Sequence, residues 1–185
     1  FVDGSDTTSY VAFYNFGDVG QNEDDRIVSG YKYEGVVVPQ IQYLSNNRSI
    51  ALKDNGFTIY QGSQIPKEVK TIETDKEIVS TFYDDDMVGL VFKNDSKDKQ
   101  YIMEVYNTAD GKLKFKEDFN IPYTTIKLSG GNILMYNSSQ MCVMNSRGVQ
   151  KYLGSVDGTI KDFFKIGMNR YLLVLDSGVD VIKLS

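Results

Sequence analysis

The sequence predicts an all-β protein, and three observations support this prediction. The strongly β-forming residues Val, Ile, Tyr and Phe account for 55 of the 185 residues, whereas Ala and Leu together account for 14. Short apolar runs are separated by Gly, Asn, Asp and Ser clusters every eight to twelve residues, as strands are by turns. No window shows apolar residues at helical spacing over more than two turns.

A unit of strand, turn, strand, turn, strand repeats along the chain. The clearest copy has strands at Ile41–Leu44, Ile50–Leu52 and Phe57–Tyr60, with turns at Asn46–Arg48 and Asp54–Gly56. Three later copies follow the same order. Their strands are expected at Ile78–Tyr83, Met87–Phe92 and Tyr101–Tyr106; at Thr125–Leu128, Ile133–Tyr136 and Met141–Met144; and at Ile160–Ile166, Tyr171–Leu175 and Val179–Leu184.

The period of the repeat indicates a β-propeller. The second strands of the four copies are spaced by 38, 45 and 38 residues, measured at Ile50, Val88, Ile133 and Tyr171. A fourth strand closes each of the first three copies, at Glu68–Glu73, Leu113–Asp118 and Val149–Leu153. Four short antiparallel strands in roughly 40 residues are typical of one propeller blade. A β-sandwich also has short strands, but it has no reason to repeat its turn spacing.

The register of the repeat is offset from the ends of the chain. The first strand, Tyr10–Asn15, resembles the third strand at Tyr101–Asn107 and is followed by Arg26–Tyr33 as a fourth. The last copy stops after its third strand, so the pattern predicts 17 strands, one more than a closed ring of four such blades uses. We therefore expect about four blades that form a C-terminal segment of a larger propeller. The alternative is a small closed ring with Tyr10–Asn15 displaced. The expected domain or segment is 1–185, with a partial blade at 8–35 and blades at about 36–74, 75–119, 120–155 and 156–185.

The Tyr- and Val-rich strands and the Asp/Asn-Gly turns resemble the PQQ-like or WD-like β-propeller superfamily. The run Met141–Ser185 resembles an uncharacterised family of membrane-anchored, extracytoplasmic propeller-like proteins of Gram-positive bacteria. The chain has no Trp, so it lacks the tryptophan docking motif of quinone enzymes and the Trp-Asp dipeptide of WD repeats. The resemblance implies an extracytoplasmic location in the cell envelope, with an anchor lost upstream. It implies no cofactor.

The absence of His excludes most common hydrolase mechanisms, because no Ser-His-Asp, Cys-His or HExxH arrangement is available. Glycoside hydrolysis needs only two carboxylates and passes this filter, but no pair stands out, so no catalytic residue is predicted. The densest acidic cluster, Asp84–Asp86, lacks the spacing of an EF-hand-like loop. We expect a solvated turn there, and no metal site is predicted.

Charge and apolar content restrict the partners. With 20 basic and 25 acidic residues and a pI near 4.8, the chain is not expected to bind nucleic acid. The locally basic stretch Lys112–Lys116 alternates as a solvated strand does. Cys142, the single cysteine, is expected to be a small buried hydrophobe. The longest apolar run is too short to span a bilayer.

Candidate binding residues follow from the propeller prediction, because the loops after the second and fourth strands form one face on which ligands usually bind. Asn and Tyr side chains in such loops can hydrogen-bond to a sugar or peptide, or stack against it. The alternative is that the Asp residues of the set are turn formers that cap the backbone beside Gly. The candidates are Asp54, Asn120, Tyr123, Asn137, Asp157 and Asp176.

The sequence favours a non-catalytic binding or scaffolding module of the bacterial cell envelope, with a protein, peptide or glycan as ligand. The alternative is a carboxylate-dependent carbohydrate-active enzyme, which requires a deep central pocket with two facing carboxylates about 5–9.5 Å apart. Open blade edges also predict self-association, because unpaired strands are sites of association.

Overall fold

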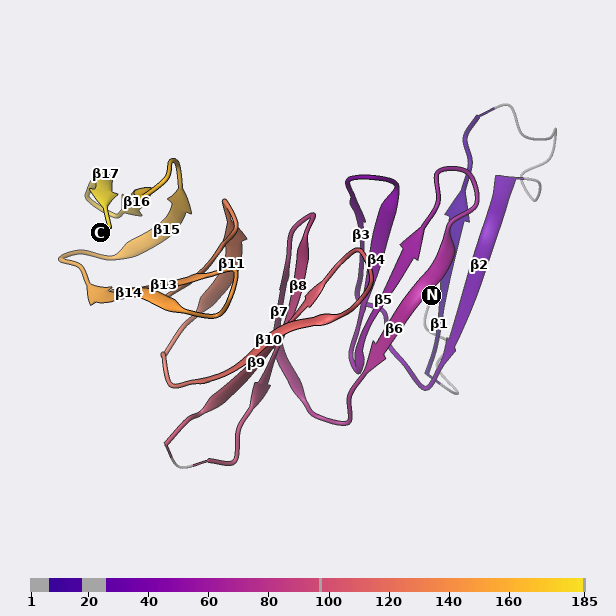
Figure 1. Ribbon diagram of the computed structural model, residues 1–185, viewed down its shortest axis with the longest axis horizontal. Helices are drawn as coiled ribbons and strands as arrows, with labels where there is room; N and C mark the ends of the chain where they lie inside the picture. The colour runs from indigo at the N-terminus through magenta and orange to yellow at the C-terminus, as the bar shows by residue number, and fades with distance from the viewer. Residues whose placement is uncertain (1–6, 18–25, 97, 185) are drawn as a thin grey trace.

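The computed structural model describes residues 7–17, 26–96 and 98–184, and in these residues it contains 17 strands in five antiparallel sheets. The first sheet has two strands, the next three have four each, and the fifth has three (Figure 1). The predictions of an all-β fold and of four-stranded antiparallel sheets are confirmed. Residues 18–25, within the predicted partial blade, lie outside the described residues.

Strands follow each other in the sheets in chain order, each pairing with the next. The first sheet contains β1 (Thr8–Tyr14) and β2 (Ile27–Glu34); the second contains β3 (Gln40–Leu44), β4 (Arg48–Lys53), β5 (Gly56–Gln61) and β6 (Lys67–Glu73). The third contains β7 (Ile78–Tyr83), β8 (Met87–Lys93), β9 (Tyr101–Asn107) and β10 (Leu113–Phe119). The fourth contains β11 (Thr125–Ser129), β12 (Asn132–Tyr136), β13 (Gln140–Asn145) and β14 (Gln150–Ser155), and the fifth contains β15 (Ile160–Lys165), β16 (Arg170–Leu175) and β17 (Gly178–Lys183).

The central strands of the four-stranded sheets are buried on both faces. All residues of β4 are buried, and so are all but the last residue of β5 and of β8. Burial on both faces explains why Ile50–Leu52 and Met87–Phe92 within these strands do not alternate between apolar and polar residues. The first sheet differs, because β1 alternates between buried and exposed residues and so has only one covered face.

The hydrophobic core consists of four clusters in the described residues, each between two consecutive sheets. Val11 and Phe13 of the first sheet meet Tyr60 of the second, and the second and third sheets bury Ile50 against Leu90. Corresponding clusters join the third sheet to the fourth and the fourth to the fifth. The sheets therefore stack in chain order, and each depends for its core on its neighbours.

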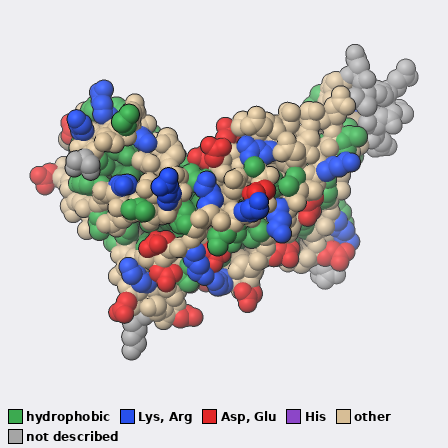
Figure 2. All heavy atoms as spheres, viewed as in Figure 1, with side chains coloured by type: hydrophobic (Ala, Val, Ile, Leu, Met, Phe, Trp, Pro, Cys, Tyr) green, Lys and Arg blue, Asp and Glu red, His purple; other side chains and the backbone are tan. Residues whose placement is uncertain are grey.

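Charged side chains are interspersed over the surface shown in Figure 2, where basic and acidic groups lie side by side. In the predicted basic strand, Lys116 pairs with Glu104 at 3.1 Å, and the preceding Lys112 pairs with Asp110 at 2.9 Å. The described part of the chain holds no helix long and apolar enough to cross a membrane.

Cys142 lies in the cluster between the third and fourth sheets and is fully buried. Burial raises the pKa of its thiol to about 12, because the thiolate has no water to solvate it. We expect the native protein to react with a disulfide reagent such as DTNB only at the rate of unfolding, and the protein in guanidinium chloride to react at once. Rapid reaction of the native protein would contradict this burial.

Gly89 in β8 offers a direct test of the packing within the third sheet. The Phe82 ring covers it from β7, and a Cβ atom at Gly89 would overlap the ring. We expect Gly89→Ala to lower the free energy of unfolding in urea by about 1–3 kcal/mol, because the buried ring must move. The matched control is Gly30→Ala in β2, where a Cβ atom meets only the Val11 carbonyl oxygen at 3.9 Å and stability should stay nearly unchanged. Equal effects of the two substitutions would show that ring packing is not the cause.

Candidate functional site

The loops of the molecule form two faces. Face A comprises the loops after the second and fourth strands of each sheet, and face B comprises those after the first and third strands. All six predicted binding residues lie on face A. They are spread along four sheets, and no hydrogen bond joins any two of the six. The fold therefore places them on one face without bringing them together into one pocket.

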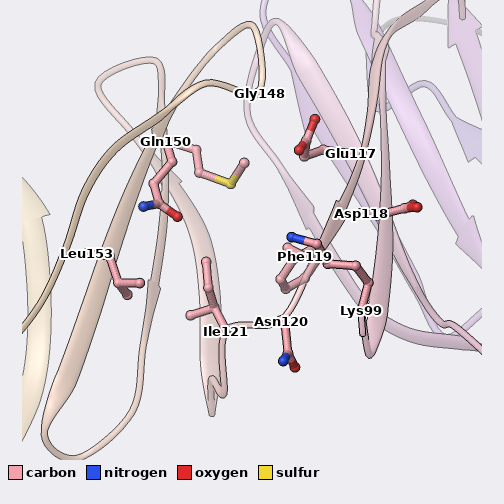
Figure 3. A pocket seen from close by; sticks show the side chains of 10 residues that line it. Lys99, Glu117, Asp118, Phe119, Asn120, Ile121, Gly148, Gln150 and Leu153 are labelled. Atoms are coloured by element: carbon pink, nitrogen blue, oxygen red, sulfur yellow. The ribbon is translucent and has the colours of Figure 1, made fainter. Parts of the chain in front are cut away.

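Asn120 is exposed and lines a groove of about 230 Å³ between β10 and β14 (Figure 3). Two carboxylates, Glu117 and Asp118, line the same groove, but they are consecutive residues of β10 and point in different directions. The carboxylate-dependent enzyme predicted as the alternative is therefore not supported.

Tyr123 and Asp157 differ in their freedom to meet a ligand. The Tyr123 hydroxyl donates to Ser80 Oγ at 2.9 Å, and its ring packs 5.3 Å from that of Tyr101. Burial raises the pKa of Tyr123, in agreement with a side chain held inside the structure. Asp157 is exposed, and its carboxylate has no hydrogen-bond partner among the described residues.

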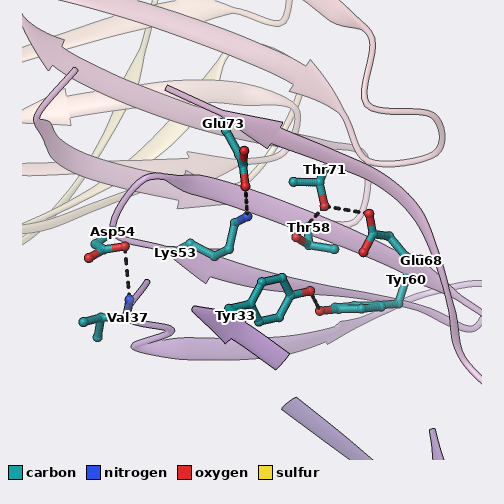
Figure 4. Close-up of polar contacts among 9 residues, drawn as sticks. All are labelled: Tyr33, Val37, Lys53, Asp54, Thr58, Tyr60, Glu68, Thr71 and Glu73. Carbon is teal, nitrogen blue, oxygen red and sulfur yellow. Dashed lines mark hydrogen bonds and ion pairs between the residues drawn. The ribbon is translucent and has the colours of Figure 1, made fainter. Parts of the chain in front are cut away.

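Asp54 and Asp176 accept equivalent hydrogen bonds in two sheets. Asp54 Oδ1 accepts a hydrogen bond from the Val37 N–H at 3.2 Å (Figure 4), and Asp176 Oδ1 accepts one from the Thr159 N–H at 3.1 Å. The Thr159 N–H lowers the pKa of Asp176 below its usual range. Each carboxylate ties the loop after a second strand to the segment before a first strand. Both residues lie in turns, as the turn-forming interpretation expects, but the hydrogen bonds of their carboxylates reach a segment 17 positions earlier in the chain, and their binding role stays a prediction.

Asn137 holds a third loop of face A in place. Its Oδ1 accepts hydrogen bonds from the N–H groups of Ser139 and Gln140, at 3.0 and 2.9 Å. Its Nδ2 donates to the Pro122 carbonyl oxygen at 2.8 Å and so joins the β12–β13 loop to the β10–β11 loop. The loops of face A are therefore held in place by hydrogen bonds from their own side chains.

The acidic cluster Asp84–Asp86 is a turn on face B. Asp84 Oδ1 accepts from the N–H groups of Asp86 and Met87, both at 2.8 Å. Asp85 Oδ1 accepts from the Ser45 N–H of the preceding sheet at 2.7 Å. In residues 7–17, 26–96 and 98–184 no three or more acidic or Cys side chains are grouped to hold a metal ion.

Polar side chains link the sheets in places that the sequence did not indicate. The Tyr83 hydroxyl of β7 accepts from Gln40 Nε2 at 2.6 Å and donates to Gln42 Oε1 at 3.1 Å, both on β3. Lys127 of β11 likewise pairs with Asp162 of β15. The first strands of neighbouring sheets therefore lie side by side.

The second sheet contains a buried lysine that sequence reasoning also missed. The Lys53 side chain is fully buried, its Nζ lies 3.2 Å from Glu73 Oε1, and it lies 5.0 Å from the centre of the Tyr33 ring (Figure 4). Burial and a hydrogen bond between the Tyr33 and Tyr60 hydroxyls raise the pKa of Tyr60 far above its usual value. This group holds the first two sheets together.

Stacked four-stranded sheets with adjacent first strands define the chain as part of a β-propeller. Solved propellers agree. The Neurospora crassa Pan2 WD40 domain matches with a TM-score of 0.52 and 14% identity over 80% of this chain and 48% of that chain. Hsv2 of Kluyvelomyces marxianus gives 0.54 and 12% over 85% and 49%, and BBS1N in complex with ARL6DN gives 0.52 and 12% over 100% and 67%. At these identities the likeness shows the fold alone.

Residues 1–184 match the model of DUF5711, a family of unknown function, and the chain belongs to that family. No curated protein matches it. The chain spans about half the length of most of the solved structures it resembles. The predicted resemblance to WD-like propellers is confirmed, whereas the membrane-anchored Gram-positive family stays a prediction.

The Lys127–Asp162 pair gives a pH-dependent prediction. Burial by itself raises the pKa of Asp162, but hydrogen bonds from Lys127, from the Tyr136 hydroxyl at 2.8 Å and from the Phe163 N–H outweigh it, and the pKa lies below its ordinary 3.8. The pair therefore stabilises the fold at neutral pH, and this contribution is lost as the pH falls below 3.8 through the lower folded-state pKa.

We expect Asp162→Asn to lower the free energy of unfolding at neutral pH by about 0.5–1 kcal/mol, because the pair is partly exposed. In urea titrations, the difference from the unmodified protein should shrink below pH 3.8 and disappear in stronger acid. The control is Asp180→Asn, at an exposed position of β17, which should leave the free energy of unfolding unchanged. A difference that grows in acid would contradict the assignment.

Proposed function

We propose that this chain is a non-catalytic binding or scaffolding module of the bacterial cell envelope that engages a protein, peptide or glycan through its propeller loops. The observation that carries the proposal is the fixed geometry of face A. Asp54, Asn137 and Asp176 use their side chains to hold three loops by hydrogen bonds to backbone groups. A surface ordered in advance loses less conformational entropy when it binds a ligand.

One solved propeller supports a binding function. The BBS1N chain, 12% identical and with a TM-score of 0.52, was solved in complex with ARL6DN, so one chain of this fold meets a partner. Propellers also offer loop surfaces on a rigid scaffold, which is where binding residues are most often found.

The face A residues divide into supporting and contacting groups. Asp54, Asn137 and Asp176 support the loops, and Tyr123 is half-buried against the core between the third and fourth sheets. Asn120 and Asp157 are exposed, so we assign direct contact with the ligand to these two residues.

The proposal includes an extracytoplasmic location with an anchor upstream, and its support is the resemblance of the run Met141–Ser185. Protease treatment of intact cells that carry the tagged full-length protein should remove the tag.

Self-association through open sheet edges is also part of the proposal. Its support is the fifth sheet, in which β17 pairs on one side only and exposes Val179 and Val181. A monomer by light scattering at high concentration would contradict it.

The proposed function is tested with the immobilised chain and two probes, purified Gram-positive cell-wall sacculi and solubilised membrane proteins of the same cells. We expect one probe to bind saturably, and Asn120→Ala/Asp157→Ala to weaken that binding about tenfold while leaving the melting temperature unchanged. The control is Asp180→Ala/Lys183→Ala on β17, which should bind normally.

Two outcomes would overturn the proposal. If neither Asn120→Ala/Asp157→Ala nor the control double variant weakens binding, face A is not the binding surface. Release of reducing sugar from the sacculi at a rate that depends on Glu117 or Asp118 would restore the enzyme interpretation.

A further inference from the structure

Face B carries a hollow of about 310 Å³ between the fourth and fifth sheets, which lie at the left of Figure 1. Its walls come from the ends of β12, β13, β14, β15 and β16 and from the β15–β16 loop. We call it the Lys151 hollow. Six of its eight lining residues are polar, and these are Asn132, Asn145, Lys151, Lys165, Asn169 and Tyr171.

Hydrogen bonds between the two sheets fix the shape of the hollow. Asn132 Nδ2 of β12 donates to the Tyr171 hydroxyl of β16 at 2.6 Å. The Lys165 N–H donates to Ser129 Oγ, and Lys165 Nζ donates to the Gly130 carbonyl oxygen, both at 2.9 Å. The lining residues are therefore held in position before any ligand arrives, which lowers the entropy that binding costs.

The neutral groups of the hollow offer hydrogen-bond donors. Asn145 Oδ1 accepts from two backbone N–H groups of the β13–β14 turn, at 2.9 and 3.0 Å, so the side chain has its amide N–H groups left to donate. The Tyr171 oxygen accepts from Asn132, so its own O–H is left to donate. Donors of this kind call for a ligand that is rich in acceptors.

Two cations line the hollow together with these donors. Lys151 is exposed and Lys165 is half-buried. Neither forms an ion pair in the described parts of the chain, and Lys165 uses one of the three N–H donors of its ammonium group on the Gly130 carbonyl oxygen. The described residues that line the hollow include no Asp or Glu. The ligand that fits these groups is an anion.

The surroundings of the hollow add positive charge. Arg147, Arg170 and Lys183 are exposed on the same face, and Arg170 and Lys183 lie directly opposite each other in β16 and β17, where like charges repel. The face B loops of the last two sheets, 130–131, 146–149 and 166–169, contain no acidic residue, whereas those of the third sheet contain Asp84–Asp86 and Asp110. Because the whole chain has a net charge of −5, this basic region is a local feature that attracts anions.

A phosphate monoester suits the hollow better than a carboxylate does. Lys binds phosphate as a point charge, whereas the planar fork of Arg is the usual partner of a carboxylate, and no Arg is among the described residues that line the hollow. A phosphate monoester also has three terminal oxygens, against two in a carboxylate. It can therefore accept from both ammonium groups and from the neutral donors at the same time.

We propose that the Lys151 hollow binds a phosphate monoester carried by a small polar molecule. Lys151 and Lys165 pair with the phosphate oxygens, and the neutral donors complete the contacts. The two apolar residues of the lining, Met168 and Leu184, contact the carbon atoms of the ligand. This is a second site, on face B, and it does not depend on the proposed role of face A.

The test is isothermal titration of the chain with glycerol 3-phosphate, with glycerate as the matched carboxylate and glycerol as the neutral compound. We expect glycerol 3-phosphate to bind about tenfold more tightly than glycerate, and glycerol not to bind. Equal or tighter binding of glycerate would overturn the phosphate assignment. No binding of either anion would overturn the site.

A pair of lysine variants locates the site. Lys151→Gln should weaken binding of glycerol 3-phosphate about tenfold and leave the melting temperature unchanged, because Lys151 is exposed. The matched control is Lys161→Gln, which removes the same charge from an exposed position of β15 that does not line the hollow, and it should bind normally. Equal weakening in both variants would show that the anion is attracted only by overall charge, and would overturn the assignment to the hollow.

Two sources can present a phosphate monoester, a soluble ester and a lipid headgroup. Sedimentation with vesicles of phosphatidylcholine and phosphatidic acid, compared with phosphatidylcholine alone, distinguishes them. Binding to the phosphatidic acid vesicles that glycerol 3-phosphate displaces would support the hollow with a headgroup as its ligand. Binding of glycerol 3-phosphate without vesicle binding would support it with a soluble ester.

The face A variant separates this proposal from the proposed function. Asn120→Ala/Asp157→Ala should bind glycerol 3-phosphate as the unmodified protein does, so either proposal can fail while the other stands. Loss of glycerol 3-phosphate binding in that variant would overturn the Lys151 hollow as the site.

Discussion

The packing of one sheet on the next is the constraint on which the rest of this molecule depends. Central strands such as β4 and β8 are buried on both faces, so they contribute to the cores on either side. Ile50 and Leu90 lie in the cluster between the second and third sheets, whereas Met103 and Met135 lie in the next one. Because a sheet cannot bury both of its faces alone, each sheet is stabilised by packing against the sheets before and after it in the chain.

Polar side chains form hydrogen bonds and ion pairs between the sheets and in the loops. Lys53 is fully buried yet reaches Glu73, and Lys127 joins neighbouring first strands through Asp162. Asp54 and Asp176 close their loops in the same way in two different sheets. These bonds satisfy charges and backbone groups that stacking would otherwise leave without partners, and they also make the loop faces rigid.

Hydrogen bonds from side chains hold the loops of both faces. Face A offers Asn120 and Asp157 on loops held by other residues. Face B offers the turns at Asn46 and Asp84, which side-chain hydrogen bonds also hold. The two faces are at opposite ends of the same strands, so one scaffold can present two independent surfaces.

The sequence by itself determined the strands, their antiparallel order and the four-strand period, because β-propensity and turn residues are local properties. It also indicated that Asp54 and Asp176 lie in turns, whereas the hydrogen bonds of their carboxylates reach backbone N–H groups 17 positions away and depend on the fold. The polar contacts between sheets were decided by tertiary structure. Tyr83 and Gln42 lie 41 positions apart on separate strands, and only the stacking of the second and third sheets brings them together. In the sequence Arg48 is an ordinary strand residue, and its hydrogen bond to Thr108, sixty positions later, depends on the tertiary structure.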